Sequence, residues 1–335
     1  MINIKEKRYC AGERSNLSEV LPLQFPLSLS VEASSLCNFR CNYCSNSNIN
    51  KKKENKFLSF KDFAQIVDNI VASGFKLKAL NVARLGEPLL NKELPEIIGY
   101  AKKSNVFEKI LMITNGSLLR PDINEKIISA GLDKIVISIQ GLNAKKYFEI
   151  SNVKIDFNGL ISNIAHLHSI KDNCKIHIKA FHESLDGNTK DFYSVFTDIC
   201  DELSIEHVVP YMVDVNYDQL KCETTKNRYG DSIKYNNVCP LPFYTISILS
   251  NGNVSSCCIN NHDSLIIGNI HDSTILEIWN SKKLLNFRKI HIGGNKEKHP
   301  ICSKCNFPTY GIQESDNIEG INEVIKDHYL KGTSI

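Results

Sequence analysis

Apolar residues in the first two thirds of the chain recur with two alternating periods. Runs with strand-like spacing occur six times and are separated by segments with helical spacing. Ser59 before segment 60–73 and Gly74 after it are typical helix start and stop residues. Strands that alternate with helices indicate an α/β fold with a parallel sheet and right-handed crossovers. The predicted strands are 29–35, 77–83, 109–114, 134–140, 175–181 and 203–209, and the predicted helical segments are 60–73, 95–103, 121–131, 144–169 and 189–200.

The pattern changes after the sixth strand. Residues 213–238 are polar and irregular, which predicts a linker. Beyond them, apolar runs at 242–249 and 254–258 flank the turn sequence SNGN, which predicts a hairpin, and a helix is predicted over 275–290. We therefore expect an N-terminal extension (1–28), an α/β domain (29–212), the linker (213–238), a small cysteine-containing α+β domain (239–310) and a C-terminal tail (311–335).

The first cysteine cluster follows the first predicted strand. Cys37, Cys41 and Cys44 have the spacing C-x3-C-x2-C. Three thiolates in one short loop can hold three irons of a [4Fe–4S] cluster and leave the fourth iron open to a ligand. A zinc knuckle or a set of reactive thiols are the alternatives. A zinc site needs a fourth ligand, and residues 1–165 contain no histidine.

Further motifs follow the next strands in order. Gly86, Glu87 and Pro88 come after the second strand, Asn115 after the third, and Ser138 and Gln140 at the end of the fourth. Each alone is an ordinary turn or surface polar group. The sequence does not distinguish an open sheet from a partial barrel, but in both the chemistry lies where the strands end.

In this order, the motifs resemble those of the radical SAM (S-adenosylmethionine) superfamily. The resemblance implies a partial (β/α)6 TIM-like barrel with SAM on the open iron of the cluster. Tyr43 would lie against the adenine of SAM. Gly86, Glu87 and Pro88 would bind its amino group, while Asn115, Ser138 and Gln140 would complete the SAM site. One departure is that the fifth strand (175–181) lacks a clear G-x-I-x-G-like element.

A second group of cysteines lies in the C-terminal region. Cys239 and Cys257 flank the predicted hairpin, and Cys302 and Cys305 form a C-x2-C pair. Four thiolates suit zinc and a [4Fe–4S] cluster equally well. With Gly252, the GNI at 268–270 and the EIW at 277–279, they resemble the SPASM and twitch domains of some radical SAM enzymes. Only five cysteines occur from Cys239 onward, so the resemblance implies one auxiliary [4Fe–4S] cluster.

The resemblance also implies a reaction. Reductive cleavage of SAM yields a 5′-deoxyadenosyl radical, which takes a hydrogen atom from the substrate. The arrangement is similar to that of radical SAM dehydrogenases that oxidise an aminocyclitol alcohol. We therefore expect oxidation of a small polyol, sugar or aminocyclitol, with the auxiliary cluster taking the second electron. The alternatives are a radical SAM epimerase or a peptide-modifying maturase, and a non-catalytic metal-binding scaffold. A maturase usually carries an N-terminal leader-binding domain, whereas about 28 residues precede the first strand here.

Four residues are candidates for substrate chemistry. Lys179 and His182 lie near the end of the fifth strand and Tyr211 follows the sixth, so each could deprotonate the substrate or bind its hydroxyls. Cys258 is a spare thiol or a hydrogen-atom donor, and the donor role would indicate an epimerase. Cys222 in the linker is a core or surface thiol by default, and the alternatives are a hydrogen-atom donor or a lid residue.

Composition excludes some partners. The chain has 335 residues with 40 basic and 37 acidic side chains, and this balance gives no field that would favour nucleic acid. The apolar runs are strand-sized and the N-terminus lacks a signal core, which predicts a cytoplasmic protein without a membrane segment. Twelve cysteines in a reducing compartment favour metal ligation over disulfides. The resemblance implies a flavodoxin or ferredoxin as the reductant.

Overall fold

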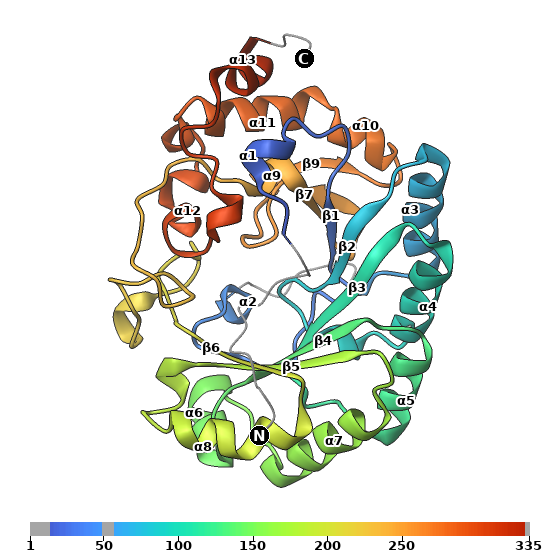
Figure 1. Cartoon of the computed structure of the whole chain (residues 1–335), viewed down its shortest axis with the longest axis vertical. Helices are drawn as coiled ribbons and strands as arrows, with labels where there is room; N and C mark the ends of the chain where they lie inside the picture. Colours follow the sequence, from blue (N-terminus) through green and yellow to red (C-terminus); the bar gives the residue numbers. More distant parts are fainter. Residues whose placement is uncertain (1–13, 49–56, 332–335) are drawn as a thin grey trace.

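A single nine-stranded sheet organises the protein (Figure 1). The computed structural model describes residues 14–48 and 57–331. The strand order is β6-β5-β4-β3-β2-β1-β7-β8-β9. All neighbours from β6 to β7 are parallel, while β8 pairs antiparallel with β7 and β9. The strands are β1 (Ser28–Val31), β2 (Leu77–Val82), β3 (Phe107–Thr114), β4 (Lys134–Ile139), β5 (Lys175–Phe181), β6 (Glu202–Glu206), β7 (Thr245–Ile248), β8 (Asn253–Ser255) and β9 (Ile266–Asn269).

The six predicted parallel strands form the partial barrel, and this expectation is confirmed. The sequence did not indicate that β7 would join β1 in parallel, with Ser28 opposite Thr245 and Val31 opposite Ile248. The C-terminal region therefore continues the sheet of the α/β region. The predicted hairpin is present as β7 and β8, but its first strand is shorter than expected because residues Leu241–Tyr244 form the short helix α9.

Helices cover the outer face of the sheet, with α3, α4, α5 and α7 in a row beside β1 to β5 (Figure 1). The helix predicted over 60–73 is confirmed. Its Ser59 side chain accepts a hydrogen bond from Asp62 N, and Gly74 ends it with φ 72°. The helices are α1 (Leu17–Val20), α2 (Ser45–Asn48), α3 (Phe60–Ser73), α4 (Leu94–Ser104), α5 (Pro121–Ser129), α6 (Ala144–Ser151), α7 (Phe157–Ile170), α8 (Thr189–Phe196), α9 (Leu241–Tyr244), α10 (Ile275–Trp279), α11 (Lys282–Ile292), α12 (Phe307–Tyr310) and α13 (Glu323–Lys331).

Two predicted helices are each divided in two. Segment 144–169 forms α6 and α7, because Asn152 ends α6 in the left-handed conformation and Asp156 caps the start of α7. Segment 275–290 forms α10 and α11, because the Ser281 side chain accepts a hydrogen bond from Leu284 N and starts a new helix. Local capping groups therefore override a continuous apolar pattern.

Side chains alternate between the two faces of the barrel strands. Leu29 and Val31 of β1 are fully buried against the helices, whereas Ser28 and Ser30 line the interior. The predicted linker contains one 3₁₀ turn, Tyr217–Gln219, and residues of this segment close one side of the interior. Leu17 and Leu21 of the N-terminal extension pack with Phe243 of the C-terminal region. The domain boundaries themselves stay predictions.

No helix in the described part of the chain is long and apolar enough to cross a membrane.

Candidate functional site

The interior of the partial barrel contains a cavity of about 420 Å³, which is here called the large cavity. Its volume lies within the usual range of small-molecule pockets. The wall combines residues from the strand ends, the first cysteine loop, the predicted linker and the C-terminal region. Among the candidates from the sequence, the wall includes Cys37, Cys41, Cys44, Tyr43, Gly86, Glu87, Asn115, Ser138, Gln140, Lys179, Tyr211 and Cys258.

The first cysteine loop follows β1 and is held by backbone hydrogen bonds. Arg40 N donates to Ser151 O at 2.8 Å, and Asn42 N donates to Ile150 O at 3.0 Å, so the end of α6 supports the loop. All three thiols face the large cavity. Burial raises the pKa of Cys37 to about 11 and raises the pKa of Cys41 and Cys44 as well.

Gly86 lets the loop after β2 pack directly on the cysteine loop. A Cβ atom at this position would lie 1.9 Å from Ser34 O and 2.7 Å from Leu36 O, so only glycine fits. The next residue, Glu87, donates its backbone N–H to Leu36 O at 2.7 Å. Pro88 is buried and begins a 3₁₀ turn behind the loop.

The Glu87 carboxylate joins the loops after β2 and β3. It accepts hydrogen bonds from Thr114 Oγ1 at 2.7 Å, Asn115 N at 2.8 Å and Leu89 N at 3.1 Å. The side chain is 2% exposed. Burial raises the pKa of Glu87 to about 7, although these three bonds act in the opposite direction. The resemblance implied a SAM contact for this residue, and the structure shows that it also holds the two loops together.

The other predicted SAM contacts face the same space. Asn115 donates from Nδ2 to Asn38 Oδ1 at 2.9 Å, which ties β3 to the cysteine loop. Gln140 donates to Ser138 O at 3.1 Å, and its Oε1 atom is buried without a hydrogen-bond partner among the described residues. Tyr43 packs edge-on against Phe181 of β5, with ring centroids 4.8 Å apart.

These residues fit a three-thiolate cluster with SAM. Three half-buried thiols with raised pKa values line one cavity, and a bound iron cluster would stabilise their thiolate forms. Gln140 lines the same cavity, and its Oε1 is a buried acceptor without a hydrogen-bond partner among the described residues, as a site for a ligand with amino and hydroxyl groups requires. Residue roles at this site stay proposals.

A buried ionic network lies at the ends of β5 and β6. Glu206 Oε2 accepts hydrogen bonds from Lys179 Nζ at 2.9 Å and from Arg228 Nε at 2.8 Å, and Arg228 Nη1 donates to Tyr211 Oη at 2.9 Å. Burial and the Arg228 charge lower the pKa of Lys179 to about 8, although Glu206 raises it. Arg228 and Lys179 hold the pKa of Glu206 near 2 against the effect of burial.

The network reaches the predicted SAM site through Phe181. Lys179 Nζ lies 5.7 Å and Arg228 Cζ lies 5.8 Å from the centre of the Phe181 ring, which also contacts Tyr43. His182 is exposed, stacks near His207 and is not in the wall of the large cavity, and Cys222 is not in it either. Of the candidates near the ends of β5 and β6, Lys179 and Tyr211 therefore lie in the wall of the large cavity.

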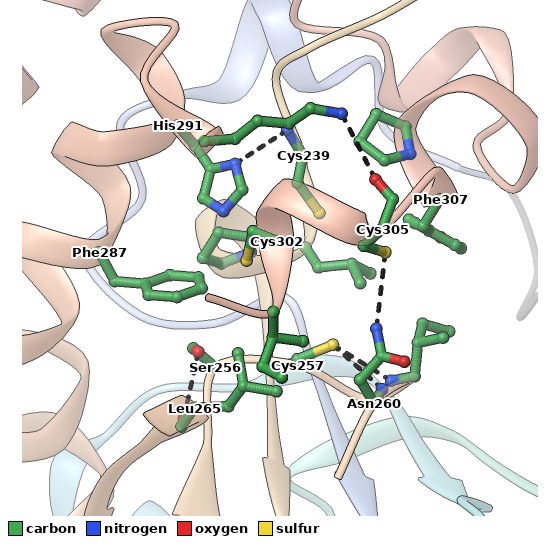
Figure 2. A pocket seen from close by; sticks show the side chains of 16 residues that line it. Cys239, Ser256, Cys257, Asn260, Leu265, Phe287, His291, Cys302, Cys305 and Phe307 are labelled. Carbon is green, nitrogen blue, oxygen red and sulfur yellow. Dashed lines mark hydrogen bonds between the residues drawn. The ribbon is translucent and has the colours of Figure 1, made fainter. Parts of the chain in front are cut away.

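The four C-terminal cysteines surround a second, smaller cavity, here called the four-thiol cavity (Figure 2). Cys239 precedes α9, Cys257 follows β8, and Cys302 and Cys305 bound one 3₁₀ turn. The sequence predicted this convergence. Figure 2 shows their sulfur atoms directed toward one space from separate segments.

The donor set of the four-thiol cavity fits an iron–sulfur cluster. Among the described residues, no carboxylate lies in its wall. Ile259 N and Asn260 N each lie 3.4 Å from Cys257 Sγ, and Asn260 Nδ2 lies 3.5 Å from Cys305 Sγ. Such N–H groups stabilise the negative sulfur atoms of a cluster. Burial raises the pKa of all four thiols, and a bound metal would reverse that effect.

Arg84 and Glu32 connect the two cavities. The Arg84 guanidinium lies 3.3 Å from Glu32 Oε1, and both side chains are almost fully buried. Arg84 Nη2 also donates to Asn260 O at 3.1 Å. Arg84 lies in the wall of the large cavity and Asn260 in the wall of the four-thiol cavity, so this hydrogen bond connects the two sites.

Sequence reasoning missed several residues of the site. Glu206 occupies an inward position of β6, and the alternating sequence ELSIE was a signal for it. Arg228 lies in the irregular linker, and no periodicity pointed to it. Arg84 precedes Gly86 by two residues and was not selected from the sequence; its burial, which makes a carboxylate partner necessary, is visible only in the structure.

Comparison with known proteins identifies the class of protein. Residues 31–193 match the profile of the radical SAM superfamily, and residues 239–306 match that of the SPASM iron–sulfur cluster-binding domain. The chain therefore belongs to the radical SAM superfamily: it is a radical SAM enzyme with a [4Fe–4S] cluster and SAM, and it carries a SPASM domain. This confirms the superfamily predicted from the cysteine loop.

Particular relatives differ in how much of the chain they match. The chain is 23% identical over 284 residues to the S-adenosyl-L-methionine-dependent 2-deoxy-scyllo-inosamine dehydrogenase of Niallia circulans, covering 83% of this chain and 92% of the relative. It is 30% identical to the GTP 3′,8-cyclase of Psychromonas ingrahamii over 147 residues, which are 43% of this chain and 42% of the cyclase. The match thus spans about two fifths of the cyclase's length.

Solved structures share the fold. The structure of BtrN in complex with AdoMet and 2-DOIA superposes with a TM-score of 0.58 at 20% identity, over 88% of this chain and 98% of BtrN. The structure of anSMEcpe with AdoMet and the Kp18Cys peptide gives a TM-score of 0.61 at 15% identity, over 92% of this chain and 97% of that one. One relative thus holds a small molecule and the other a peptide.

Proposed function

We propose that this protein is a radical SAM oxidoreductase that oxidises a hydroxyl group of a small polyol, sugar or aminocyclitol. One auxiliary [4Fe–4S] cluster on Cys239, Cys257, Cys302 and Cys305 would take the second electron. The observation that carries the proposal is the set of residues that line the large cavity. It brings the three-cysteine loop, the Lys179 network and the segment next to the four-thiol cavity to one space.

The predicted residues have distinct roles in this proposal. Cys37, Cys41 and Cys44 ligate the first cluster. Tyr43, Gly86, Glu87, Pro88, Asn115, Ser138 and Gln140 form the SAM site. When bound, SAM and its cluster supply a radical that removes one hydrogen atom from the substrate, and the auxiliary cluster supplies an acceptor for one electron.

Lys179 accepts the remaining proton. Oxidation of an alcohol to a carbonyl removes two electrons and two hydrogen nuclei, one as a hydrogen atom and one as the hydroxyl proton. A general base must be neutral, and burial together with Arg228 brings the pKa of Lys179 to about 8. Glu206 fixes the position of the amine, and Arg228, which also donates to Tyr211 Oη, binds the same Glu206 oxygen.

The size of the large cavity and the dehydrogenase relative favour a small substrate. The cavity is lined from the barrel strands, the linker and the C-terminal region, so its wall closes around a ligand of limited size. The relative with the longer match acts on 2-deoxy-scyllo-inosamine. A flavodoxin or ferredoxin is the proposed reductant.

A radical SAM epimerase is the second candidate, and Cys258 favours it. Cys258 lies in the wall of the large cavity, and burial raises its pKa to about 12, so the sulfur keeps its hydrogen. A protonated thiol beside the substrate could return a hydrogen atom to the opposite face of a carbon radical. In that case the product would have the mass of the substrate.

The deciding experiment measures products of the anaerobically reconstituted enzyme with SAM and a reductant. Purified polyols, sugars and aminocyclitols are compared with a host peptide fraction. We expect 5′-deoxyadenosine with a small substrate, together with one carbonyl product two mass units lighter per 5′-deoxyadenosine. A product of unchanged mass that is lost in Cys258→Ala, while SAM cleavage persists, would establish the epimerase instead.

Stimulation by peptides alone would establish a maturase. No 5′-deoxyadenosine under any condition, with both clusters intact, would overturn the catalytic proposal.

A further inference from the structure

His291 contributes a buried imidazole to the wall of the four-thiol cavity. It lies near the end of α11, is 1% exposed and packs on Phe287 with ring centroids 5.1 Å apart. Figure 2 shows its ring beside Cys239 and Cys302, at the edge of the space that the four sulfur atoms face. No pattern in the sequence pointed to this residue.

The hydrogen bonds of His291 define its tautomer. Nδ1 accepts a hydrogen bond from the backbone N–H of Cys239 at 3.4 Å. An imidazole nitrogen that accepts carries a lone pair, so the proton of the neutral ring is on Nε2. His291 therefore presents an N–H donor at its second nitrogen.

This second nitrogen has no hydrogen-bond partner among the described residues. A buried donor without an acceptor destabilises a protein, so native structures rarely leave one unpaired. The other polar side chains in the same wall are engaged: Ser256 Oγ donates to Leu265 O, Lys296 Nζ donates to Cys305 O at 3.4 Å, and Asn260 donates from Nδ2 to Cys305 Sγ and accepts at Oδ1 from Val213 N. The wall also contains four cysteine sulfur atoms, which can accept a hydrogen bond.

We propose that His291 Nε2–H donates a hydrogen bond to a sulfur atom of the auxiliary cluster and raises the reduction potential of that cluster. The reduced cluster carries one more negative charge than the oxidised one, so an N–H···S bond stabilises the reduced form more. A higher potential makes the cluster a better acceptor for the second electron. The inference rests on the proposed assignment of the four thiols to an iron–sulfur cluster and not on the identity of the substrate.

His299 provides a comparison within the same region. Its Nδ1 accepts from Ile301 N and Cys302 N, both at 3.3 Å, so it has the same tautomer as His291. Its Nε2 donates to Ser264 O at 3.3 Å, and the residue is not in the wall of the four-thiol cavity. Phe287 packs against both rings, at 5.1 Å and 5.2 Å. The two histidines thus differ in where the Nε2–H points.

Three variants distinguish the roles of the two nitrogen atoms of the His291 ring. In His291→Asn, the amide oxygen replaces Nδ1 as acceptor and the distal donor is lost. In His291→Gln, the amide nitrogen replaces the distal donor and the Nδ1 acceptor is lost. His299→Asn is the matched control, because it removes a distal donor that already has a carbonyl acceptor. All three are made in the full-length chain with Cys37, Cys41 and Cys44 replaced by alanine, so that one cluster gives the signal.

The test is an anaerobic redox titration followed by electron paramagnetic resonance, after iron analysis. We expect His291→Asn to lower the ratio of reduced to oxidised cluster at a fixed potential about tenfold, which is about 59 mV for one electron. His291→Gln should shift the ratio less than threefold and His299→Asn not at all. The hyperfine couplings between exchangeable protons and the reduced cluster should weaken in His291→Asn and stay unchanged in the other two variants.

An unchanged potential in His291→Asn with four irons bound would overturn the inference and leave the proposed function intact. Nitrogen couplings that identify His291 as an iron ligand would also overturn it. Zinc in place of iron in the parent chain would instead overturn the proposed auxiliary cluster, and the iron analysis distinguishes this outcome.

Discussion

Cys257 and Cys258 are consecutive in the chain, yet their side chains line different cavities. Cys257 joins the four-thiol cavity, and Cys258 lies in the wall of the large cavity together with Lys179. Two neighbouring residues of the segment after β8 therefore belong to the walls of the two different sites. A substrate in the large cavity would lie close to the proposed electron acceptor, as oxidation by the auxiliary cluster requires.

Serine substitutions at these two positions should have different effects on iron content. Cys257→Ser removes a proposed ligand, so we expect iron to fall from about eight to about four per chain. Cys258→Ser should retain about eight irons. Iron and sulfide analysis after anaerobic reconstitution measures both. Equal iron contents in the two variants would contradict the assignment of Cys257 as a ligand.

Gly86→Ala should disrupt the contact between the two loops at the SAM site. The new Cβ would approach Ser34 O to 1.9 Å, and the loop must shift away from the Glu87 N–H bond to Leu36. We expect the free energy of unfolding to fall by about 1–3 kcal/mol and SAM binding to weaken.

Gly99→Ala is the matched control, because this helical glycine has open space around it. It should raise stability by about 0.5–1 kcal/mol. Urea unfolding and SAM titration measure both variants. If Gly86→Ala binds SAM as the parent does, the two loops are less closely coupled than their contacts indicate.

The pH dependence of turnover should report Lys179. A lysine that acts as base is active when neutral, so kcat should rise as pH passes about 8 and then level off. Arg228 lowers the pKa of Lys179, so Arg228→Gln should move this rise to higher pH, whereas Arg228→Lys should keep it near its original position. Lys179→Met should lower kcat at least a hundredfold and leave SAM cleavage in the absence of substrate in place. A pH profile that is flat from 6 to 9 would exclude this base.

Arg84→Met should destabilise the protein strongly. It removes the cation beside Glu32 in an almost fully buried pair, and such losses reduce the free energy of unfolding by about 3–5 kcal/mol. Arg120→Met is the control, because the Arg120–Asp122 pair is more than half exposed and should change stability by less than about 1 kcal/mol. Similar urea midpoints for the two variants would show that Arg84 does not hold the cavities together.

Local patterns in the chain predict most of the secondary structure and the two groups of cysteines. Periodicity predicts strands and helices because side-chain direction repeats every 2 residues in a strand and every 3.6 in a helix. The spacing C-x3-C-x2-C predicts a loop that binds a cluster, because one short segment of the chain holds all three thiols close together. The order of Glu87, Asn115 and Gln140 after successive strands then indicated the superfamily.

Contacts between segments that are far apart in the chain are visible only in the tertiary structure. Lys179, Glu206 and Arg228 lie up to 49 residues apart and form one ionic network, and β7 pairs with β1 across more than 200 residues. The opposite directions of Cys257 and Cys258 and the tautomer of His291 depend on the same distant contacts. Such contacts form where whole elements pack, and packing energy depends on every surface that the fold brings together, so no local pattern in the sequence records them.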